Sequence, residues 1–315
     1  MMKRLLAFAM IATTSLSAAE PIRIGMIGLD TSHAPAFTKL LNERSDAQVV
    51  AAVAESSPDI ESSHTRVSGF TATLRDDFGV KIVATIEEML PLVDAVMVES
   101  VDGRPHLRQA TAAIEAGKPV FIDKPMAASL ADVRAIFALA EKHGVPVWSS
   151  SNLRFHSGVV AASHDASIGE QTAVISYGPA KIDPTHPDLM WYGIHPVEAL
   201  FTVMGPGCVQ VQRTFSEGTD VVTGLWSDGR VGTLIGLRKG KAVYGVKVFG
   251  TKGVAEHSAG GAYPEQIEAI VEAFKTGEVP VTPAQTIEIF AFMEAADLSK
   301  AQDGAPISLE ALLEN

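Results

Sequence analysis

The chain has 315 residues, with 25 Lys and Arg against 37 Asp and Glu, which gives a formal net charge of −12. An acidic balance of this size argues against nucleic acid and anionic membranes as partners. The length is sufficient for two domains. The single cysteine, Cys208, excludes an internal disulfide, and we interpret it as a buried structural thiol because no activating His and acid can be read around it.

The first residues predict an export signal. Lys3 and Arg4 precede an apolar run, and Ser17 and Ala19 are small enough for a signal-peptidase site. The apolar run is too short to span a membrane. We therefore expect a signal peptide over residues 1–19, cleaved after Ala19, and a periplasmic or secreted protein. An uncleaved interfacial anchor is the alternative.

Residues 20–148 alternate short apolar runs with helical patterns. Two helices are expected, over 107–116 and 130–143, and each is followed by a glycine that suits a helix end. Continuous apolar strands alternating with helices predict a parallel sheet covered on both faces, which binds ligands at the carboxyl ends of its strands. The expected strands cover 22–27, 49–53, 94–98, 119–122 and 145–148.

The rhythm changes after Trp148, where longer strands are separated by glycine turns. Asp228-Gly229 indicates a hairpin. Two helices close the chain, one ending before Gly277 and one running from Pro283 to about Lys300. We expect an α+β domain over 149–315, with helices on one face of a mostly antiparallel open sheet. Its expected strands cover 172–177, 208–215, 220–227, 231–237 and 243–249.

Three segments carry a resemblance to a known family. They are Gly-Lys-Pro-Val-Phe-Ile-Asp-Lys-Pro at 117–125, Ile-Arg-Ile-Gly-Met-Ile-Gly-Leu-Asp-Thr-Ser-His at 22–33, and Glu55 after the second apolar run. Together they resemble the Gfo/Idh/MocA oxidoreductases, which act on sugars and polyols with a nicotinamide cofactor. The resemblance covers most of residues 20–300, and the family's Glu-Lys-Pro is here Asp123-Lys124-Pro125. It implies a Rossmann-like dinucleotide-binding domain over 20–148 and a substrate domain over 149–315 whose open sheet face can form a homo-oligomer.

One part of the resemblance is broken. A dinucleotide-binding turn has the pattern G-x-G-x-x-G, and here only Gly28 is retained, because Asp30 and His33 occupy the other two positions. Asp30, Thr31 and Ser32 predict a helix cap whose oxygens take the N–H groups that a phosphate would use. The Asp30 carboxylate would also repel pyrophosphate by ~1–4 kcal/mol. A shortened loop, with His33 already inside the helix, is the alternative alignment.

The resemblance implies further cofactor contacts. Glu55 falls where the family binds the adenosine ribose, and Ser100 and His106 fall near the nicotinamide, as do Asp123 and Lys124. A 2′-phosphate beside Glu55 would be repelled, so NAD is preferred over NADP. The alternatives are an exposed Glu55 and a solvated Lys124 at a strand end, and the sequence leaves open whether the cofactor is retained. Because free NAD is not expected outside the cytoplasm, an exported enzyme would hold it tightly and regenerate it in each cycle.

Two further segments resemble the family's substrate side. Asn152-Leu-Arg-Phe implies that Arg154 binds a hydroxyl or carboxylate, with a salt bridge between domains as the alternative. Gly193-Ile-His implies that His195 is an acid/base or a substrate ligand. The family's aspartate falls on Trp191, a flat face for a sugar ring. The remaining substrate candidates are His186, Asp188, Tyr192 and Glu198, and an alternative metal site would combine His186, Asp188, His195 and Glu198.

These expectations lead to one mechanism with two rivals. Lys124 would hydrogen-bond the reacting hydroxyl of a sugar or sugar derivative, His195 would move its proton, and hydride would pass to the nicotinamide. An exported enzyme of this kind fits a reaction that is redox-neutral overall. The rivals are a cofactor-independent or metal-assisted lyase or hydrolase on the same fold, and a non-catalytic carbohydrate-binding protein.

Overall fold

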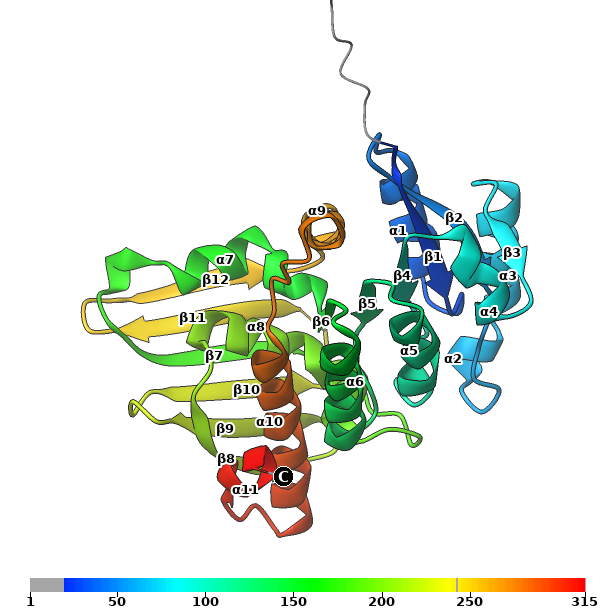
Figure 1. Ribbon diagram of the computed structural model, residues 1–315. Coiled ribbons are helices and arrows are strands. Elements are labelled where there is room, and N and C mark those ends of the chain that lie inside the picture. Colours follow the sequence, from blue (N-terminus) through cyan, green and yellow to red (C-terminus); the bar gives the residue numbers. More distant parts are fainter. Residues whose placement is uncertain (1–19, 242, 315) are drawn as a thin grey trace, which may run out of the picture.

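The computed structural model describes residues 20–241 and 243–314, so the expected signal peptide over 1–19 lies outside the described part of the chain. Two sheets lie side by side, the first at the right of Figure 1 and the second at the left. Among the described helices, none combines the length and the apolar character that crossing a bilayer would require.

The first sheet has six strands in the order β3-β2-β1-β4-β5-β6, and every pair is parallel. This is the doubly wound order of a Rossmann-like domain, as the sequence predicts. The strands are β1 (Ile22–Ile27), β2 (Ala47–Val53), β3 (Lys81–Val83), β4 (Ala95–Val98), β5 (Val120–Asp123) and β6 (Val147–Ser150). Its helices are α1 (His33–Asn42), α2 (Glu61–His64), α3 (Val67–Asp76), α4 (Ile86–Met89), α5 (His106–Glu115) and α6 (Leu130–His143), with a 3₁₀ turn η1 (Leu90–Leu92).

Alternating side chains of these strands belong to two separate apolar clusters, one on each face of the first sheet. In β4, Val96 and Val98 pack with α5 and α6, whereas Met97 points to the other face and packs with α1. Each strand residue is therefore buried on its own side, which explains why the strands are continuous apolar runs. Ser129 caps α6 by accepting a hydrogen bond from the Asp132 N–H, and Gly144 ends it in the left-handed conformation.

The second sheet has seven strands in the order β12-β11-β7-β10-β9-β8-β13. All neighbours are antiparallel except β7 and β10, so the sheet is mixed but mostly antiparallel. Asp228-Gly229 forms the predicted β9–β10 turn, with Gly229 at φ 90°. The strands are β7 (Gln171–Pro179), β8 (Cys208–Phe215), β9 (Thr219–Trp226), β10 (Val231–Leu237), β11 (Tyr244–Gly250), β12 (Val254–Ala259) and β13 (Ile307–Ser308).

One face of this sheet is covered and the other is open. Helix α8 packs on β7 and β10, α10 packs on β8, and α7 packs on β12. The open face exposes Val209, Val221 and Leu225, and its use for oligomerisation stays a prediction. The remaining elements are η2 (Asn152–Phe155), α7 (Ser157–Ser163), η3 (Ala166–Ile168), the π-helix η4 (Leu189–Gly193), α8 (Ile194–Met204), α9 (Tyr263–Thr276), α10 (Pro283–Ala301) and α11 (Glu310–Glu314).

Helix α9 departs from the expected arrangement. The sequence predicts that the helix ending before Gly277 covers one face of the second sheet, but α9 returns to the first domain and packs beside α1. Ile267, Ile270 and Val271 join the apolar cluster that contains Phe37 and Leu41. The predicted apolar stripe on one side of α9 is present in the structure. Such a stripe shows that the helix is buried on that side, but it does not identify the sheet against which the helix packs.

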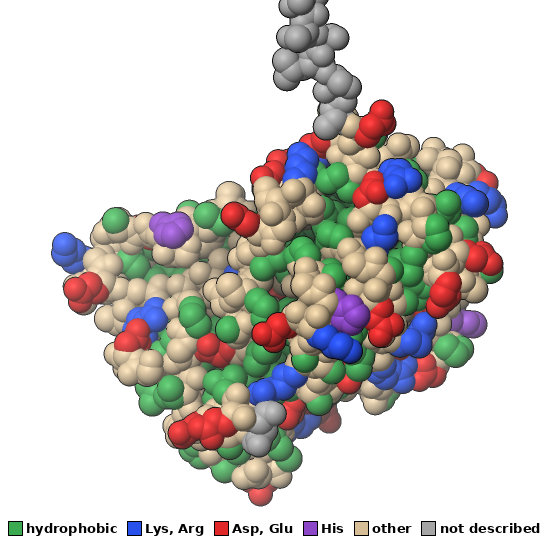
Figure 2. Space-filling model, viewed as in Figure 1, with side chains coloured by type: hydrophobic (Ala, Val, Ile, Leu, Met, Phe, Trp, Pro, Cys, Tyr) green, Lys and Arg blue, Asp and Glu red, His purple; other side chains and the backbone are tan. Residues whose placement is uncertain are grey.

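Charged side chains of both signs are interspersed on the face shown in Figure 2, and neither sign forms a continuous patch there.

Candidate functional site

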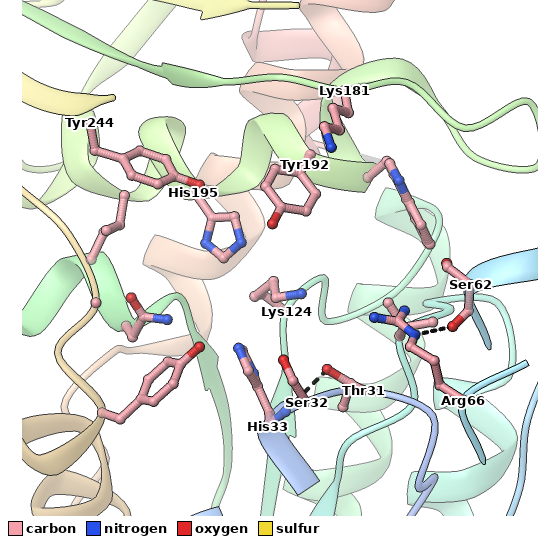
Figure 3. A pocket seen from close by; sticks show the side chains of 16 residues that line it. Thr31, Ser32, His33, Ser62, Arg66, Lys124, Lys181, Tyr192, His195 and Tyr244 are labelled. Atoms are coloured by element: carbon pink, nitrogen blue, oxygen red, sulfur yellow. Dashed lines mark hydrogen bonds between the residues drawn. The ribbon is translucent and has the colours of Figure 1, made fainter. Parts of the chain in front are cut away.

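A pocket of about 460 Å³ lies between the two domains, at the carboxyl ends of the first sheet's strands (Figure 3). This is where parallel sheets bind ligands. The first domain and the residues after β6 contribute Thr31, Ser32, His33, Ser62, Arg66, Val101, Lys124, Asn152 and Leu153. The second domain contributes Lys181, Trp191, Tyr192, His195, Tyr244, Gly261 and Tyr263.

Lys124 lies at the centre of the pocket in Figure 3, with His195 and Tyr192 on one side and His33 and Ser32 on the other. It follows β5, whose residues are all buried, and the following Pro125 is joined by a cis peptide bond. Lys124 is 6% exposed, and no described residue accepts a hydrogen bond from its ammonium group or forms an ion pair with it. A buried amine without a protein partner is placed to bind a ligand.

His195 reaches the same pocket from the first turn of α8. Its Nδ1 lies 2.7 Å from the Ser151 hydroxyl, and no described residue hydrogen-bonds Nε2. Burial, followed by the positive charge of Lys124, lowers the pKa of His195 well below its ordinary value. The ring is therefore neutral at pH 7, and Nε2 can exchange a proton with a ligand.

Aromatic rings form one wall of the pocket. Trp191 and Tyr192 lie on the π-helix just before α8, and the Tyr192 ring lies 5.1 Å from the His195 ring. Tyr244 packs edge-on against His195 at 6.0 Å. Burial raises the pKa of Tyr263 to about 12, so this phenol stays protonated and can donate a hydrogen bond. These rings suit the apolar face of a small ring-shaped ligand.

The charges that line the pocket are all positive. Arg66 and Lys181 join Lys124, and no aspartate or glutamate lines the pocket within the described part of the chain. In a chain with a net charge of −12 this local reversal is distinctive, and it favours an anionic group on the ligand.

The turn after β1 is only partly the predicted one. Gly28 has φ 85°, and a Cβ there would lie 2.1 Å from the Ser100 hydroxyl, so glycine is required. Thr31 Oγ1 accepts from the His33 N–H at 3.3 Å, but Ser32, at the N-cap of α1, makes no side-chain capping hydrogen bond. Asp30 does not face the pocket. Its carboxylate is buried, and accepts hydrogen bonds from the Val101 N–H at 3.0 Å and from the Ser63 hydroxyl.

Three predicted cofactor contacts are occupied within the protein. The carboxylate of Glu55 is half-buried and binds Arg108 and the Gln109 amide, so it is not a free glutamate. Ser100 accepts from the same amide at 2.8 Å, and His106 is bonded to the carbonyls of Ser100 and Met126. Neither Ser100 nor His106 lines the pocket, because both lie in the packed layer behind Gly28.

Two predicted substrate residues bind each other instead. Arg154 Nη2 lies 2.6 Å from Glu198 Oε2, and Nε lies 2.9 Å from the same atom. Arg154 and Glu198 thus form a salt bridge within the second domain, not the one between domains that the sequence offered as the alternative, and their role as substrate ligands stays a prediction.

The other second-domain candidates are also held away from the pocket. His186 Nε2 lies 3.0 Å from Asp102 Oδ1, and Asp188 binds Arg213 and Lys300. The alternative metal site of His186, Asp188, His195 and Glu198 is therefore not assembled, because each of these side chains has a different partner. Trp191, Tyr192 and His195 do line the pocket as predicted.

The sequence reasoning missed several residues of the site. His33 was read as a lost glycine or as a helix residue, but its ring enters the pocket floor and its Nδ1 lies 2.7 Å from Asp123 Oδ2. Glu99 follows β4 directly, so its place at a strand end is the signal that points to it. Lys181 comes two residues after the end of β7. Arg66 and Tyr263 carry no local signal, because their positions depend on how α3 and α9 pack.

The fold and site define a two-domain protein with a dinucleotide-binding type of first domain and an interdomain pocket that carries a lysine and a neutral histidine. Comparison with known proteins agrees with this class. Residues 22–151 match the family model GFO_IDH_MocA, described as an oxidoreductase family with an NAD-binding Rossmann fold. The first domain of the chain therefore matches the Gfo/Idh/MocA oxidoreductase family.

Curated relatives match over limited lengths. An inositol 2-dehydrogenase of Cereibacter sphaeroides is 34% identical over 126 residues, which is 39% of this chain and 34% of the relative. A 1,5-anhydro-D-fructose reductase of Ensifer adhaerens is 41% identical over 76 residues, 24% of this chain and 22% of the relative. An uncharacterised oxidoreductase of Bacillus subtilis is 27% identical over 60% of this chain and 62% of its own. The chain thus spans less than two thirds of each of these relatives.

Solved structures match over nearly the whole fold. GenD2 from gentamicin A biosynthesis, in complex with NAD, has a TM-score of 0.77 at 20% identity, covering 92% of this chain and 97% of its own. A myo-inositol 2-dehydrogenase of Lactobacillus plantarum has a TM-score of 0.78 at 18% identity, covering 91% and 99%. At these identities the likeness shows the fold.

Proposed function

We propose that the protein is an NAD-linked oxidoreductase that interconverts a hydroxyl and a carbonyl group on a sugar or polyol derivative. The observation that carries this proposal is the meeting of Lys124 and His195 in one pocket, although they come from different domains. The names of two relatives, an inositol dehydrogenase and an anhydrofructose reductase, support the substrate class.

The pocket residues fit the dinucleotide, although the groups that would donate hydrogen bonds to its phosphates differ from those of a G-x-G-x-x-G turn. Gly28 still makes the tight turn, and the lost glycine contacts are replaced by the hydroxyls of Thr31 and Ser32 and by the guanidinium of Arg66, all of which face the pocket. Hydroxyl and guanidinium groups are good hydrogen-bond donors to phosphate oxygens. Glu55 lies two residues after β2, and to bind the adenosine ribose it would exchange its contacts with Arg108 and Gln109. When bound there, NAD would accept or supply the hydride.

The proton is handled by this chain's own residues. The Lys124 ammonium group has no protein partner and can donate a hydrogen bond to the reacting oxygen of the substrate. His195 is neutral, and Ser151 fixes its ring through Nδ1, so Nε2 takes the proton from the hydroxyl or returns it. Tyr192 and Tyr244 hold this ring from the sides and exclude water from it.

The positively charged side chains that line the pocket favour substrates that carry an anionic group. Arg66 and Lys181 have no carboxylate neighbour in the pocket, so a substrate with a carboxylate or phosphate would satisfy them. A hydroxylated ring that stacks on Trp191 and carries one acidic group, such as a sugar acid or sugar phosphate, matches both features. Export remains part of the proposal through the predicted signal segment, and in an exported enzyme the reaction would be redox-neutral overall.

The decisive experiment is the absorbance and mass spectrum of the purified protein, followed by calorimetry with NAD and NADP. Bound NAD(H), or micromolar binding of NAD weakened by Arg66→Gln, supports the proposal. A protein that binds neither dinucleotide, but converts a hydroxylated substrate in a Lys124-dependent reaction, would be the cofactor-independent enzyme. That second candidate is favoured by Asp30 and His33 at the two glycine positions.

A further inference from the structure

A buried cluster of three potential metal ligands lies under the pocket. His33 begins α1, Glu99 follows β4, and Asp123 ends β5, so the three come from neighbouring strand ends of the first sheet. One ligand atom from each lies within 4.8 Å of the others. The three side chains are almost fully buried, and His33 also lines the pocket. The cluster is therefore enclosed by protein except where His33 borders the pocket.

The cluster is short of hydrogen-bond donors. Both carboxylate oxygens of Glu99 are buried and have no hydrogen-bond partner among the described residues, and neither has Asp123 Oδ1. The only bond within the cluster is the 2.7 Å contact between His33 Nδ1 and Asp123 Oδ2. Buried polar atoms nearly always have a partner, and two adjacent buried carboxylates repel each other unless a cation or proton lies between them. Lys124 acts on both carboxylates through its charge but donates a hydrogen bond to neither, so three buried oxygens still lack a direct positive partner.

We propose that His33, Glu99 and Asp123 bind one divalent first-row metal ion, of the Zn²⁺ or Mn²⁺ type. One imidazole and two carboxylates are the mixed nitrogen and oxygen donors that such ions take, whereas Ca²⁺ and Mg²⁺ prefer oxygen alone. Ligand atoms that share an ion at about 2.1 Å in tetrahedral geometry lie roughly 3.4 Å apart, so those members of the cluster that are farther apart, up to 4.8 Å, must move inward on binding the ion. Three protein ligands would leave coordination positions for water or a substrate oxygen, and of the three residues His33 lines the pocket.

The position of the site suggests a chemical role for the ion in addition to the proposed hydride transfer. Asp123 directly precedes Lys124, and His33 faces Lys124 across the pocket floor (Figure 3). An ion with open positions there would polarise the substrate oxygen that Lys124 contacts. The inference depends only on the cluster, so it holds or fails independently of whether NAD is bound.

The test uses the full-length protein purified without a histidine tag, stripped with EDTA and dialysed against Zn²⁺ or Mn²⁺. We expect about one ion per chain by elemental mass spectrometry, and a melting temperature that rises by several degrees with the ion. With Co²⁺ as the probe, visible absorption bands are expected. Wild-type protein that retains no ion after dialysis, or no absorption with Co²⁺, would overturn the proposal.

Variants locate the site. Glu99→Gln keeps the volume of the side chain and removes a ligand charge, so ion binding should weaken at least tenfold, and His33→Gln should do the same. In EDTA the Glu99→Gln protein should melt no lower than the wild type, because the substitution removes a buried unpaired carboxylate. Glu272→Gln, an exposed glutamate of α9, is the matched control and should bind as the wild type does. Stoichiometric binding that survives both Glu99→Gln and His33→Gln would disprove this assignment.

Discussion

His186 Nε2 lies 3.0 Å from Asp102 Oδ1, and this contact joins the loop after β4 in the first domain to the segment that precedes α8 in the second. Asp102 also accepts from Arg104 and from the Ser57 hydroxyl. One buried carboxylate therefore fixes the two walls of the pocket relative to each other.

Asp102→Asn should destabilise the protein by about 2–4 kcal/mol at pH 7, because it breaks a buried charged network and leaves partners unsatisfied. Urea unfolding monitored by tryptophan fluorescence measures this. Asp77→Asn, an exposed aspartate at the end of α3, should change stability by less than about 0.5 kcal/mol. Equal effects of the two substitutions would contradict the structural role of Asp102.

The same carboxylate makes a pH-dependent contribution. Burial raises the pKa of Asp102, but hydrogen bonds from His186, Arg104 and Ser57 outweigh it, so the pKa lies below the ordinary value. Its stabilising effect is therefore present above about pH 4, the value in the unfolded chain, and is lost as the pH falls below it. The difference in unfolding free energy between wild type and Asp102→Asn should shrink between pH 5 and pH 3.5, and a constant difference would rule this linkage out.

Lys124→Ala and His195→Ala should each reduce turnover by roughly 10²–10⁴-fold, the usual loss for a positioned acid or base. The double variant should be little worse than either single one, because the two groups act on the same proton. Melting temperatures should stay close to that of the wild type. Lys142→Ala, on the exposed side of α6, is the control and should keep full activity. Near-normal turnover in either single variant would remove the proposed pair.

The His195 ring should titrate below its ordinary value of about 6.5, because burial and then the charge of Lys124 oppose its protonation. Lys124→Met removes that charge, so the pKa of His195 should rise toward the ordinary value. Histidine NMR signals followed between pH 4 and pH 8 in both proteins measure the change. Since the folded pKa is lowered, His195 also makes the fold less stable as the pH drops below about 6.5. An unchanged titration in Lys124→Met would show that the two groups do not sense each other.

Arg154→Leu should cost about 3–5 kcal/mol, because it leaves the buried carboxylate of Glu198 unpaired. Adding Glu198→Leu should restore most of the loss, since an apolar pair can replace a buried ion pair. Thermal unfolding of the four proteins forms a double-mutant cycle. The double variant should also keep its KM for substrate, and a large rise in KM would return Arg154 to the substrate site.

Most of the first domain could be predicted because its strands are buried on both faces and therefore stand out as apolar runs. The predicted 130–143 helix coincides with α6, where Ser129 and Gly144 mark both ends. Strand β3 was missed because it has three residues and lies at the sheet edge. Strands β12 and β13 were missed because β12 has few buried residues and β13 has only two residues.

The site was predictable where a residue's position follows from the end of a strand. Lys124 met this condition, and the family resemblance supplied His195. The partners of Arg154, Glu198 and Asp188 could not be predicted, because a charged side chain in a sequence does not reveal which opposite charge the fold brings to it. Asp30 shows the same limit, since its inward direction depends on Ser63 of the separate helix α2.

The return of α9 to the first sheet affects the order in which the chain can fold. Phe37 and Leu41 of α1 are covered by Ile267 and Ile270, which leave the ribosome more than two hundred residues later. The N-terminal domain therefore cannot complete its apolar core during its own synthesis, and a fragment that stops near residue 151 would carry an uncovered face. Although the chain has two sheets, side chains from its last third complete the apolar core of the first one.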